Sequence, residues 1–167
     1  MKPVFKTDKK PGIKSEQIIK RFNELPAFVA TGGEIVFVSD DLLEVHTRFN
    51  LNENTMNYHK SGFGGAIYSS LDPIYPLQFI YILGEKYVVW DLAAKIEYLR
   101  PIYNNVYARF LLTHDQIYDI KEKIKTKNRT TIELAVEYTN IDSDIIYARA
   151  MKTIYIADKE YFETKNK

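Results

Sequence analysis

The sequence predicts an α+β fold in which an antiparallel β-sheet wraps around one long central helix. Three observations lead to this prediction. Residues 65–83 are apolar nearly all round, which is typical of a helix enclosed by other elements. Segments with strand-like alternation flank this helix on both sides. Successive strands are joined by short links, which favour antiparallel pairing.

The composition is that of one globular domain, and it excludes several kinds of site. The chain has 167 residues, and 23 Lys and Arg against 22 Asp and Glu leave a net charge of +1. This balance gives no general attraction to nucleic acid or membranes. Cysteine is absent, so disulfides and thiolate metal sites are excluded. Histidines and acids show no ligand spacing, so we expect no metal. The charged start lacks the apolar core of a signal peptide, so we expect a cytoplasmic protein.

The N-terminal third indicates an arm, a helix and two strands. Residues 1–14 carry five lysines and two prolines and are expected to form a flexible basic arm before one domain over 15–157. Helical spacing begins behind Ser15, a candidate N-cap, and Pro26 ends it. Residues 33–51 predict two strands around a turn. In the second strand, one face is expected to carry Leu43, Val45, Thr47 and Phe49, and the other Glu44, His46, Arg48 and Asn50.

Two strands, a helix and two more strands are expected after the central helix. The strands are predicted over residues 86–101, 105–113, 130–139 and 144–157. Thr113 begins the helix, and Gln116 completes a capping box. The apolar stripe of this helix consists of Ile117, Ile120 and Ile124. Residues 158–167 are expected to be a charged tail.

An antiparallel sheet curled around a central helix is the arrangement called the hotdog fold. Asn57, the segment Phe63-Gly64-Gly65 and Asp72 have a spacing that resembles the motif of hotdog-fold acyl-CoA thioesterases, notably the phenylacetate-pathway type. In that family an Asn stands six residues before a His-Gly-Gly, and an acid stands seven residues after the second glycine. Phe63 departs from the pattern because it replaces the His. The resemblance to this superfamily covers roughly residues 26–157.

Gly64 and Gly65 stand where the central helix begins, and two interpretations of them are open. Glycine allows a ligand to approach the backbone closely, and the first N–H groups of a helix are unpaired at the positive end of its dipole. A thioester carbonyl placed there would gain hydrogen bonds that strengthen as an oxyanion forms, worth about 3 kcal/mol each. Alternatively, the glycines only let the helix and the sheet pack closely.

Asp72 is an acid inside an otherwise apolar segment, where an unpaired charge would cost several kcal/mol. In one interpretation the helix breaks at Pro73, and Asp72 is the N-cap of its second half. In the other, Asp72 activates water as a general base or attacks the thioester directly.

The remaining candidates surround these positions in the sequence. Asn57 can hydrogen-bond a substrate carbonyl or hold its own loop, and His59 lies in the loop before the helix. The candidates for substrate binding are Phe63, His59, Trp90 and Asp91. Asp91, beside Trp90 on a strand, is expected to face the same pocket from a partner subunit, or else to be an ordinary exposed acid.

The resemblance implies homodimers, or dimers of dimers, with two sites at the subunit interface. It implies hydrolysis of an acyl-CoA or related acyl thioester, in which Gly64 and Gly65 polarise the carbonyl and Asp72 activates water. Coenzyme A then enters only as part of the substrate, and no separate cofactor is expected. The alternative is a non-catalytic protein that binds an acyl ligand, because Phe63 removes a polar group from the site. A hydratase is a third interpretation, which would require His59 to pair with the acid.

Overall fold

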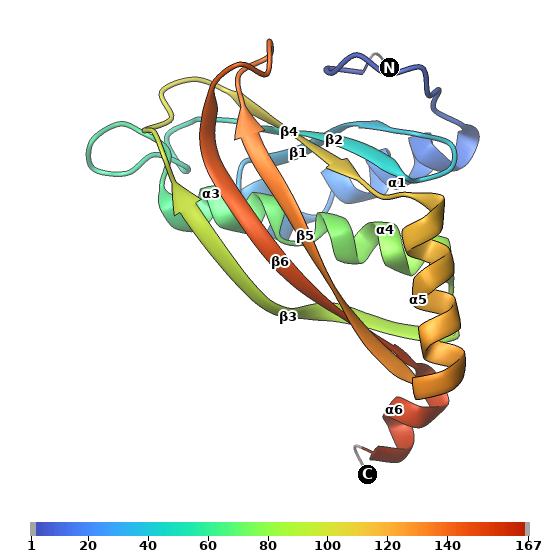
Figure 1. The fold of residues 1–167 in the computed structure, drawn as a ribbon. Helices are drawn as coiled ribbons and strands as arrows, with labels where there is room; N and C mark the ends of the chain where they lie inside the picture. Colours follow the sequence, from blue (N-terminus) through green and yellow to red (C-terminus); the bar gives the residue numbers. More distant parts are fainter. Residues whose placement is uncertain (1–2, 166–167) are drawn as a thin grey trace.

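Six antiparallel strands form one sheet that curls around a central helix (Figure 1). The computed structural model describes residues 3–165. The order of the strands in the sheet is β1-β2-β4-β5-β6-β3. The strands are β1 (Gly33–Val38), β2 (Glu44–Phe49), β3 (Tyr87–Tyr98), β4 (Val106–Leu111), β5 (Arg129–Thr139) and β6 (Ile146–Asp158). The predicted fold class is confirmed.

The helices follow the predicted order, with two short additions. They are α1 (Ile13–Asn23), α2 (Pro26–Ala30), α3 (Gly64–Leu71), α4 (Ile74–Leu83), α5 (His114–Lys127) and α6 (Lys159–Lys165). In Figure 1, α3 and α4 follow one another through the inside of the curled sheet. The predicted capping box of α5 is present, since Gln116 N donates to Thr113 Oγ1 and Thr113 N donates to Gln116 Oε1.

The central helix is broken between α3 and α4, as the proline at position 73 predicts. Pro73 and Pro76 have no N–H group, so the carbonyl oxygens of Ser69 and Asp72 lose their usual partners four residues ahead. Leu71 and Ile74, on the two sides of the break, are fully buried. The break therefore lies inside the protein, where a freed carbonyl group needs another donor.

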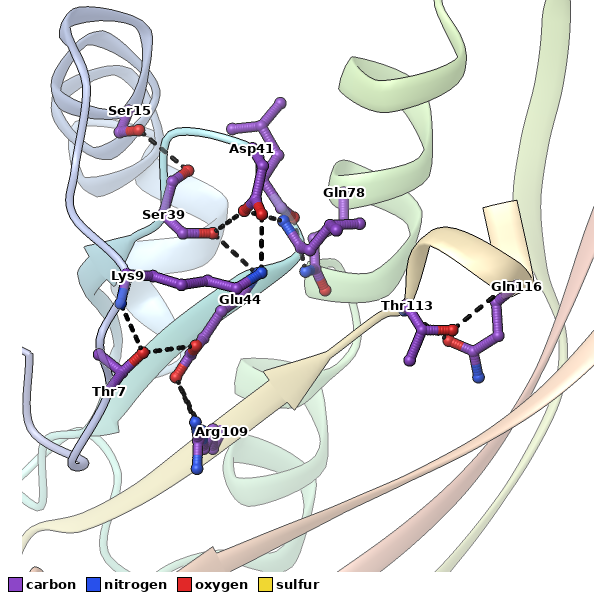
Figure 2. A network of polar contacts seen from close by, with 12 residues as sticks. Thr7, Lys9, Ser15, Ser39, Asp41, Glu44, Gln78, Arg109, Thr113 and Gln116 are labelled. Carbon is purple, nitrogen blue, oxygen red and sulfur yellow. Dashed lines mark hydrogen bonds and ion pairs between the residues drawn. The ribbon is translucent and has the colours of Figure 1, made fainter. Parts of the chain in front are cut away.

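Residues 3–12 lie along the turn between β1 and β2 (Figure 2). Asp40 N donates to the carbonyl oxygen of Lys10, and Thr7 Oγ1 donates to Glu44 Oε2 at 2.8 Å. The expected arm therefore contacts the domain over these residues, while residues 1–2 lie outside the described part of the chain. The prediction that Ser15 is an N-cap is wrong. Gly12 is the N-cap of α1, and Ser15 is the third residue of the helix, where its Oγ accepts a hydrogen bond from Gly12 N and donates one to the carbonyl oxygen of Ser39.

Strand β2 is buried on both faces, although its sequence alternates between apolar and polar residues. Glu44 and His46, on the predicted polar face, are as fully covered as Val45 and Phe49 on the other. The ring of Phe5 packs edge-on against His46, with 5.0 Å between ring centroids. The N-terminal segment therefore covers a polar face that the alternation alone assigns to solvent.

The two edges of the sheet differ in how they are covered. At β1, the Asn23 side chain accepts a hydrogen bond from Ile35 N and donates one to Ile35 O, both at 2.8 Å. A helix side chain therefore takes the place of a neighbouring strand. At the other edge, β6 is the only strand of residues 3–165 that pairs with the twelve-residue β3, and Leu92 of β3 is 57% exposed.

The C-terminal segment, expected to be a charged tail, forms α6 up to Lys165. Asp158 Oδ1 accepts a hydrogen bond from Tyr161 N at 3.0 Å, which is an N-cap contact. Phe162 packs edge-on against Trp90 at 4.8 Å between ring centroids. An Asp directly before a Lys-Glu pair is the local signal for this helix. Residues 166–167 of the expected tail lie outside the described chain.

Candidate active site

A fully buried lysine joins the central helix to strand β3. The side chain of Lys152, on β6, is 0% exposed. Its Nζ donates to Asp72 Oδ1 at 3.0 Å and to Asp91 Oδ2 at 2.7 Å. It also donates to the main-chain oxygen of Asp72. Three acceptors match the three N–H donors of an ammonium group, so Lys152 is fully satisfied without water.

The backbone explains why the lysine binds at this point. The Asp72 carbonyl lacks its helical partner because residue 76 is a proline, and Lys152 supplies the missing donor. On β3, the register with β6 shifts between Asp91 and Ala93, so Leu92 is the extra residue of a bulge. Asp91 lies opposite Ile154, which is fully buried and two residues from Lys152 on the same strand. Asp91 is therefore on the side of the sheet that faces the central helix.

Tyr68 completes the environment of Asp72. Its hydroxyl donates to Asp72 Oδ1 at 2.8 Å, one helical turn away on α3. The Lys152 Nζ lies 5.6 Å from the centroid of the Tyr68 ring, within the range of a cation–π interaction. Burial and the hydrogen bond to Asp72 raise the pKa of Tyr68 well above its usual value, so this hydroxyl is a donor at neutral pH.

The two carboxyl groups have different electrostatic environments. Burial alone would raise the pKa of Asp72, but the charge and hydrogen bond of Lys152, with the bond from Tyr68, hold it below its usual value. Burial raises the pKa of Asp91 to about 6, and the negative charge of Asp72 adds to this rise against the lowering by Lys152. The side chain of Asp72 is 42% exposed and that of Asp91 is 20% exposed. Asp72 is thus an accessible ionised carboxylate beside a more deeply placed acid.

The N-cap interpretation of Asp72 is wrong. Asp72 ends α3 in a helical conformation, Pro73 takes the N-cap position of α4, and no side chain caps α4. The carboxylate binds Lys152 and Tyr68 instead of turning toward the helix that follows. An acid in this apolar segment therefore has a charged partner that comes from the far end of the chain.

A second feature, a pocket of about 330 Å³, lies at the start of α3. Its lining includes Asn57, Gly64, Ile67, Tyr98 and Arg100. Among the described residues, no acceptor binds the N–H groups of Gly64 and Gly65, as expected at the first turn of a helix. The pocket therefore places free main-chain donors beside a space that can hold a small polar group.

Both glycines also have a packing reason. A Cβ at position 65 would lie 2.7 Å from a ring carbon of Phe63, and one at position 64 would lie 3.1 Å from the Tyr98 ring. The Tyr98 hydroxyl donates to the Gly64 carbonyl at 2.8 Å. Close packing of two aromatic rings therefore accounts for the glycines, and it leaves their N–H groups unpaired.

Asn57 holds its own loop. Its Nδ2 donates to Ser61 Oγ and Gly62 O, and its Oδ1 accepts from the main-chain N of His59 and Ser61. These contacts use both donors and both lone pairs of the amide. This geometry fits the interpretation that Asn57 holds its own loop, and the residue also lines the pocket.

The other candidates are dispersed. Trp90 stacks on Tyr155 with 4.6 Å between ring centroids and contacts α6, on the sheet face opposite to that of Asp91. His59 is exposed in its loop and touches Tyr58. Phe63 is 55% exposed and covers Gly65. The structure therefore joins Asp72 to Asp91, gathers Asn57 and Gly64 at the pocket, and places Trp90 away from both groups.

Lys152 is the residue that the motif analysis missed. The alternation in β6 nevertheless contains a signal for it. The inward positions of that strand are occupied by Ala148, Ala150, Lys152, Ile154 and Ile156, all fully buried. One lysine in a series of small and apolar inward residues indicates a buried partner of opposite charge.

Two further kinds of site are absent from residues 3–165. The part of the chain that the structure describes contains no group of three His, Cys, Asp or Glu side chains suited to a metal ion. Within the same residues, no helix has the length and apolar character needed to span a bilayer.

Comparison with known families places the chain in one of them. It belongs to the family described as a domain of unknown function, DUF4442, whose model matches residues 16–156. A search of curated proteins found no match.

Solved structures share the fold over most of the chain. A protein from Pseudomonas aeruginosa, described as of unknown function and a probable thioesterase, has a TM-score of 0.72 at 14% identity, covering 90% of this chain and 99% of its own. A thioesterase from Haemophilus influenzae has a TM-score of 0.64 at 17% identity, covering 91% and 96%. A mutant phenylacetic acid degradation protein from Thermus thermophilus has a TM-score of 0.55 at 17% identity, covering 78% and 97%. These matches confirm the resemblance to hotdog-fold proteins.

Proposed function

We propose that this member of the DUF4442 family is a thioesterase that hydrolyses an acyl-CoA or a related acyl thioester. The observation that carries the proposal is the Asp72 carboxylate, accessible to solvent and held ionised by Lys152 at the break of the central helix. The thioesterase names of two proteins with this fold support the same reaction class.

The two chemical elements of the proposed site come from different subunits. Asp72 follows Gly64 by eight residues, which is about 12 Å of helix rise. A carbonyl group bound at the N–H groups of α3 is too far from Asp72 of the same chain for a shared water molecule to contact both. A second copy of the chain can supply the missing element, so we propose a homodimer with two equivalent sites.

The uncovered edge of the sheet supports this assembly. Asn23 blocks the outer edge of β1, whereas β3 presents a long edge with Leu92 and Tyr98 more than half exposed. Such an edge is a template for pairing with another strand. Asp91 lies on β3 itself, so pairing there would bring a partner subunit next to the Asp72 and Lys152 contacts.

In the proposed reaction, the thioester carbonyl binds at the N–H groups of Gly64 and Gly65, which stabilise the oxyanion. Asp72 of the other subunit takes a proton from the attacking water. A C–O bond forms, the C–S bond breaks, and the thiolate leaves with the proton that Asp72 accepted. The products are a carboxylic acid and a thiol.

One observation favours a second candidate function, a protein that binds an acyl ligand without cleaving it. The Phe63 ring covers Gly65 and is 55% exposed, so it presents an apolar surface at the start of α3. Hydrolysis and binding are distinguished by assaying thiol release and ligand affinity on the same panel of acyl-CoA thioesters.

Substitution of Asp72 tests the proposal. Asp72→Asn keeps the volume and removes the base, so we expect the rate of thiol release to fall by about 10²- to 10⁴-fold. Asp119→Asn, the same change on the exposed face of α5, is the matched control and keeps the wild-type rate. Circular dichroism checks that both variants fold. Tight binding without thiol release by the wild-type chain would instead establish the second function.

Mixing two inactive variants tests the shared site. Gly64→Pro removes one main-chain donor at the first position of α3, where helices accept proline. Because an added Cβ would lie 3.1 Å from the Tyr98 ring, circular dichroism checks that this variant folds. If each site combines Gly64 of one subunit with Asp72 of the other, refolding this variant with Asp72→Asn gives mixed dimers with one intact site. Random pairing then restores about a quarter of the wild-type activity. No recovery on mixing would show that each site belongs to one subunit.

A further inference from the structure

We propose that Asp72 and Asp91 act as one carboxyl pair, which shares the proton taken from the attacking water, and that Lys152 is the positioning residue of this pair. The catalytic use of the pair rests on the thioesterase function proposed above. Asp72 is the member that contacts the reacting water, and Asp91 acts through it.

The contacts of Lys152 indicate that the two carboxyl groups form one pair. Two carboxylates converge on one ammonium group, with Lys152 Nζ at 3.0 Å from Asp72 Oδ1 and 2.7 Å from Asp91 Oδ2. Like charges that meet at one site cannot both ionise freely, so one added proton belongs to the pair rather than to either residue. Lys152 holds both carboxyl groups in place because it is fully buried and bonded three times.

The charge balance of the cluster favours the uptake of one proton. One lysine and two ionised aspartates leave a net charge of −1 beside the buried part of the central helix. Uptake of one proton makes the cluster neutral. A buried site with excess negative charge is therefore a stronger base than a single lysine-paired aspartate, and it loses that excess at the moment the water gives up its proton.

Accessibility assigns the roles of the two members. The Asp72 side chain is 42% exposed, so water can reach it. Asp91 Oδ1 is buried and receives no hydrogen bond from the described residues, so a negative charge on Asp91 is poorly stabilised and the pair gains by taking up a proton. The ionisable groups at the pair are Tyr68 and Asp72 from α3, Asp91 from β3 and Lys152 from β6. Burial raises the pKa of Asp91 to about 6, in agreement with this assignment.

The reaction balances without any further reactant. The water oxygen bonds to the carbonyl carbon, and its proton passes to Asp72 and is shared with Asp91. The C–S bond then breaks, and the thiolate takes the proton from the pair. Lys152 keeps its protons throughout, so its role is to hold the carboxyl groups and not to transfer a proton.

Asp91→Asn tests the inference through the pH–rate profile. In the wild-type chain, thiol release should rise with pH through about 6, where the pair loses its shared proton. In Asp91→Asn the remaining carboxylate is a weaker base, so the acid limb of the pH–rate profile should shift to lower pH by about one unit or more. The rate of thiol release at pH 7 should fall about tenfold or more. Asp119→Asn, at an exposed acid of α5 away from β3, is the control and leaves the acid limb of the profile unchanged.

Carboxyl ¹³C NMR titration supplies a readout that needs no activity. Proton uptake near pH 6 that is present in the wild-type chain and lost in Asp91→Asn supports the shared proton. Thioester hydrolysis whose acid limb stays in place in Asp91→Asn overturns the inference and leaves the proposed function standing. Uptake near pH 6 in a chain that cleaves no thioester overturns the proposed function, and with it the catalytic use of the pair.

Discussion

Two charge clusters of this protein, each built around one buried side chain, have opposite compositions. The inner cluster, beside the central helix, consists of Lys152 between Asp72 and Asp91. The outer cluster consists of Glu44 between His46 and Arg109 and is covered by the N-terminal segment. Figure 2 shows Glu44 between Arg109 and Thr7 of that segment. The inner cluster has one cation for two acids, and the outer cluster has one acid for several donors.

The contacts of Glu44 show how the outer cluster is satisfied. Arg109 Nε donates to its Oε1 at 2.8 Å, and His46 Nε2 lies 2.8 Å from the same oxygen. Thr7 binds the other oxygen. Burial opposes ionisation of Glu44, but these bonds and the charge of Arg109 hold its pKa below the usual value. Burial also lowers the pKa of His46, which favours the neutral ring.

Burial of a charged side chain does not by itself indicate a catalytic role. The Glu44 side chain is 2% exposed, its oxygens are occupied by donors, and it has little room for a further ligand. Asp72 has equally fixed partners but keeps 42% of its side chain exposed. The inner cluster has spare acceptor capacity and access to solvent, both of which a base requires.

The largest expected effect comes from removal of the inner cation. Lys152→Met should lower the free energy of unfolding at pH 7 by about 3–5 kcal/mol, because two carboxylates and one buried carbonyl lose their shared donor. Urea denaturation measures this loss. Lys123→Met, on the exposed face of α5, is the control and should change stability little. A loss below about 1 kcal/mol in Lys152→Met would show that the cluster is weakly coupled to the fold.

Asp91 of the inner cluster and Glu44 of the outer cluster should change stability with pH in opposite directions. The pKa of Asp91 is raised from 3.8 to about 6, so the folded state binds the proton more tightly than the unfolded state. Its contribution to stability is full below about pH 4 and is lost as the pH rises through about 6, by at most about 3 kcal/mol. The stability difference between the wild-type chain and Asp91→Asn should therefore decrease over this range.

For the outer cluster the sign reverses. The pKa of Glu44 is lowered from 4.5, so the unfolded state takes up this proton first as the pH falls below that value. The stability difference between the wild-type chain and Glu44→Gln should therefore increase as the pH rises from about 2.5 to about 5. Urea denaturation of the three proteins from about pH 2.5 to about 7.5 measures both trends, and a Glu44→Gln difference that falls with rising pH in the acid range would contradict the expected sign.

The smallest expected effect concerns the contribution of the N-terminal segment to stability. Thr7→Val keeps the shape of the side chain and removes the hydrogen bond to Glu44 Oε2, so stability should fall by about 1 kcal/mol. Thr164→Val, in α6, removes an exposed hydroxyl contact as the control. Faster proton exchange at Asp40 N, which donates to Lys10 O, would show that the segment loosens with it. A variant as stable as the wild-type chain would show that the Thr7 hydrogen bond contributes nothing measurable to the stability of the outer cluster.

Much of the fold was predictable because the rules that decide it act between near neighbours. Alternation over two residues indicated the strands, and the apolar segment with Pro73 indicated a buried, broken helix. Thr113 and Gln116, three residues apart, predicted the start of α5. The β6 alternation even contained the inward position of Lys152.

The partners of those residues were decided by the tertiary structure. Lys152 is 80 residues from Asp72 and 61 from Asp91 along the chain, and no local spacing connects them. The cover over Glu44 and His46 depends in the same way on a segment that folds back from the N-terminus. Sequence by itself determined which positions face inward, because local geometry sets direction. Only the folded sheet determined which buried charges meet, because their pairing requires strands and a helix that are distant in the chain to come within hydrogen-bond distance.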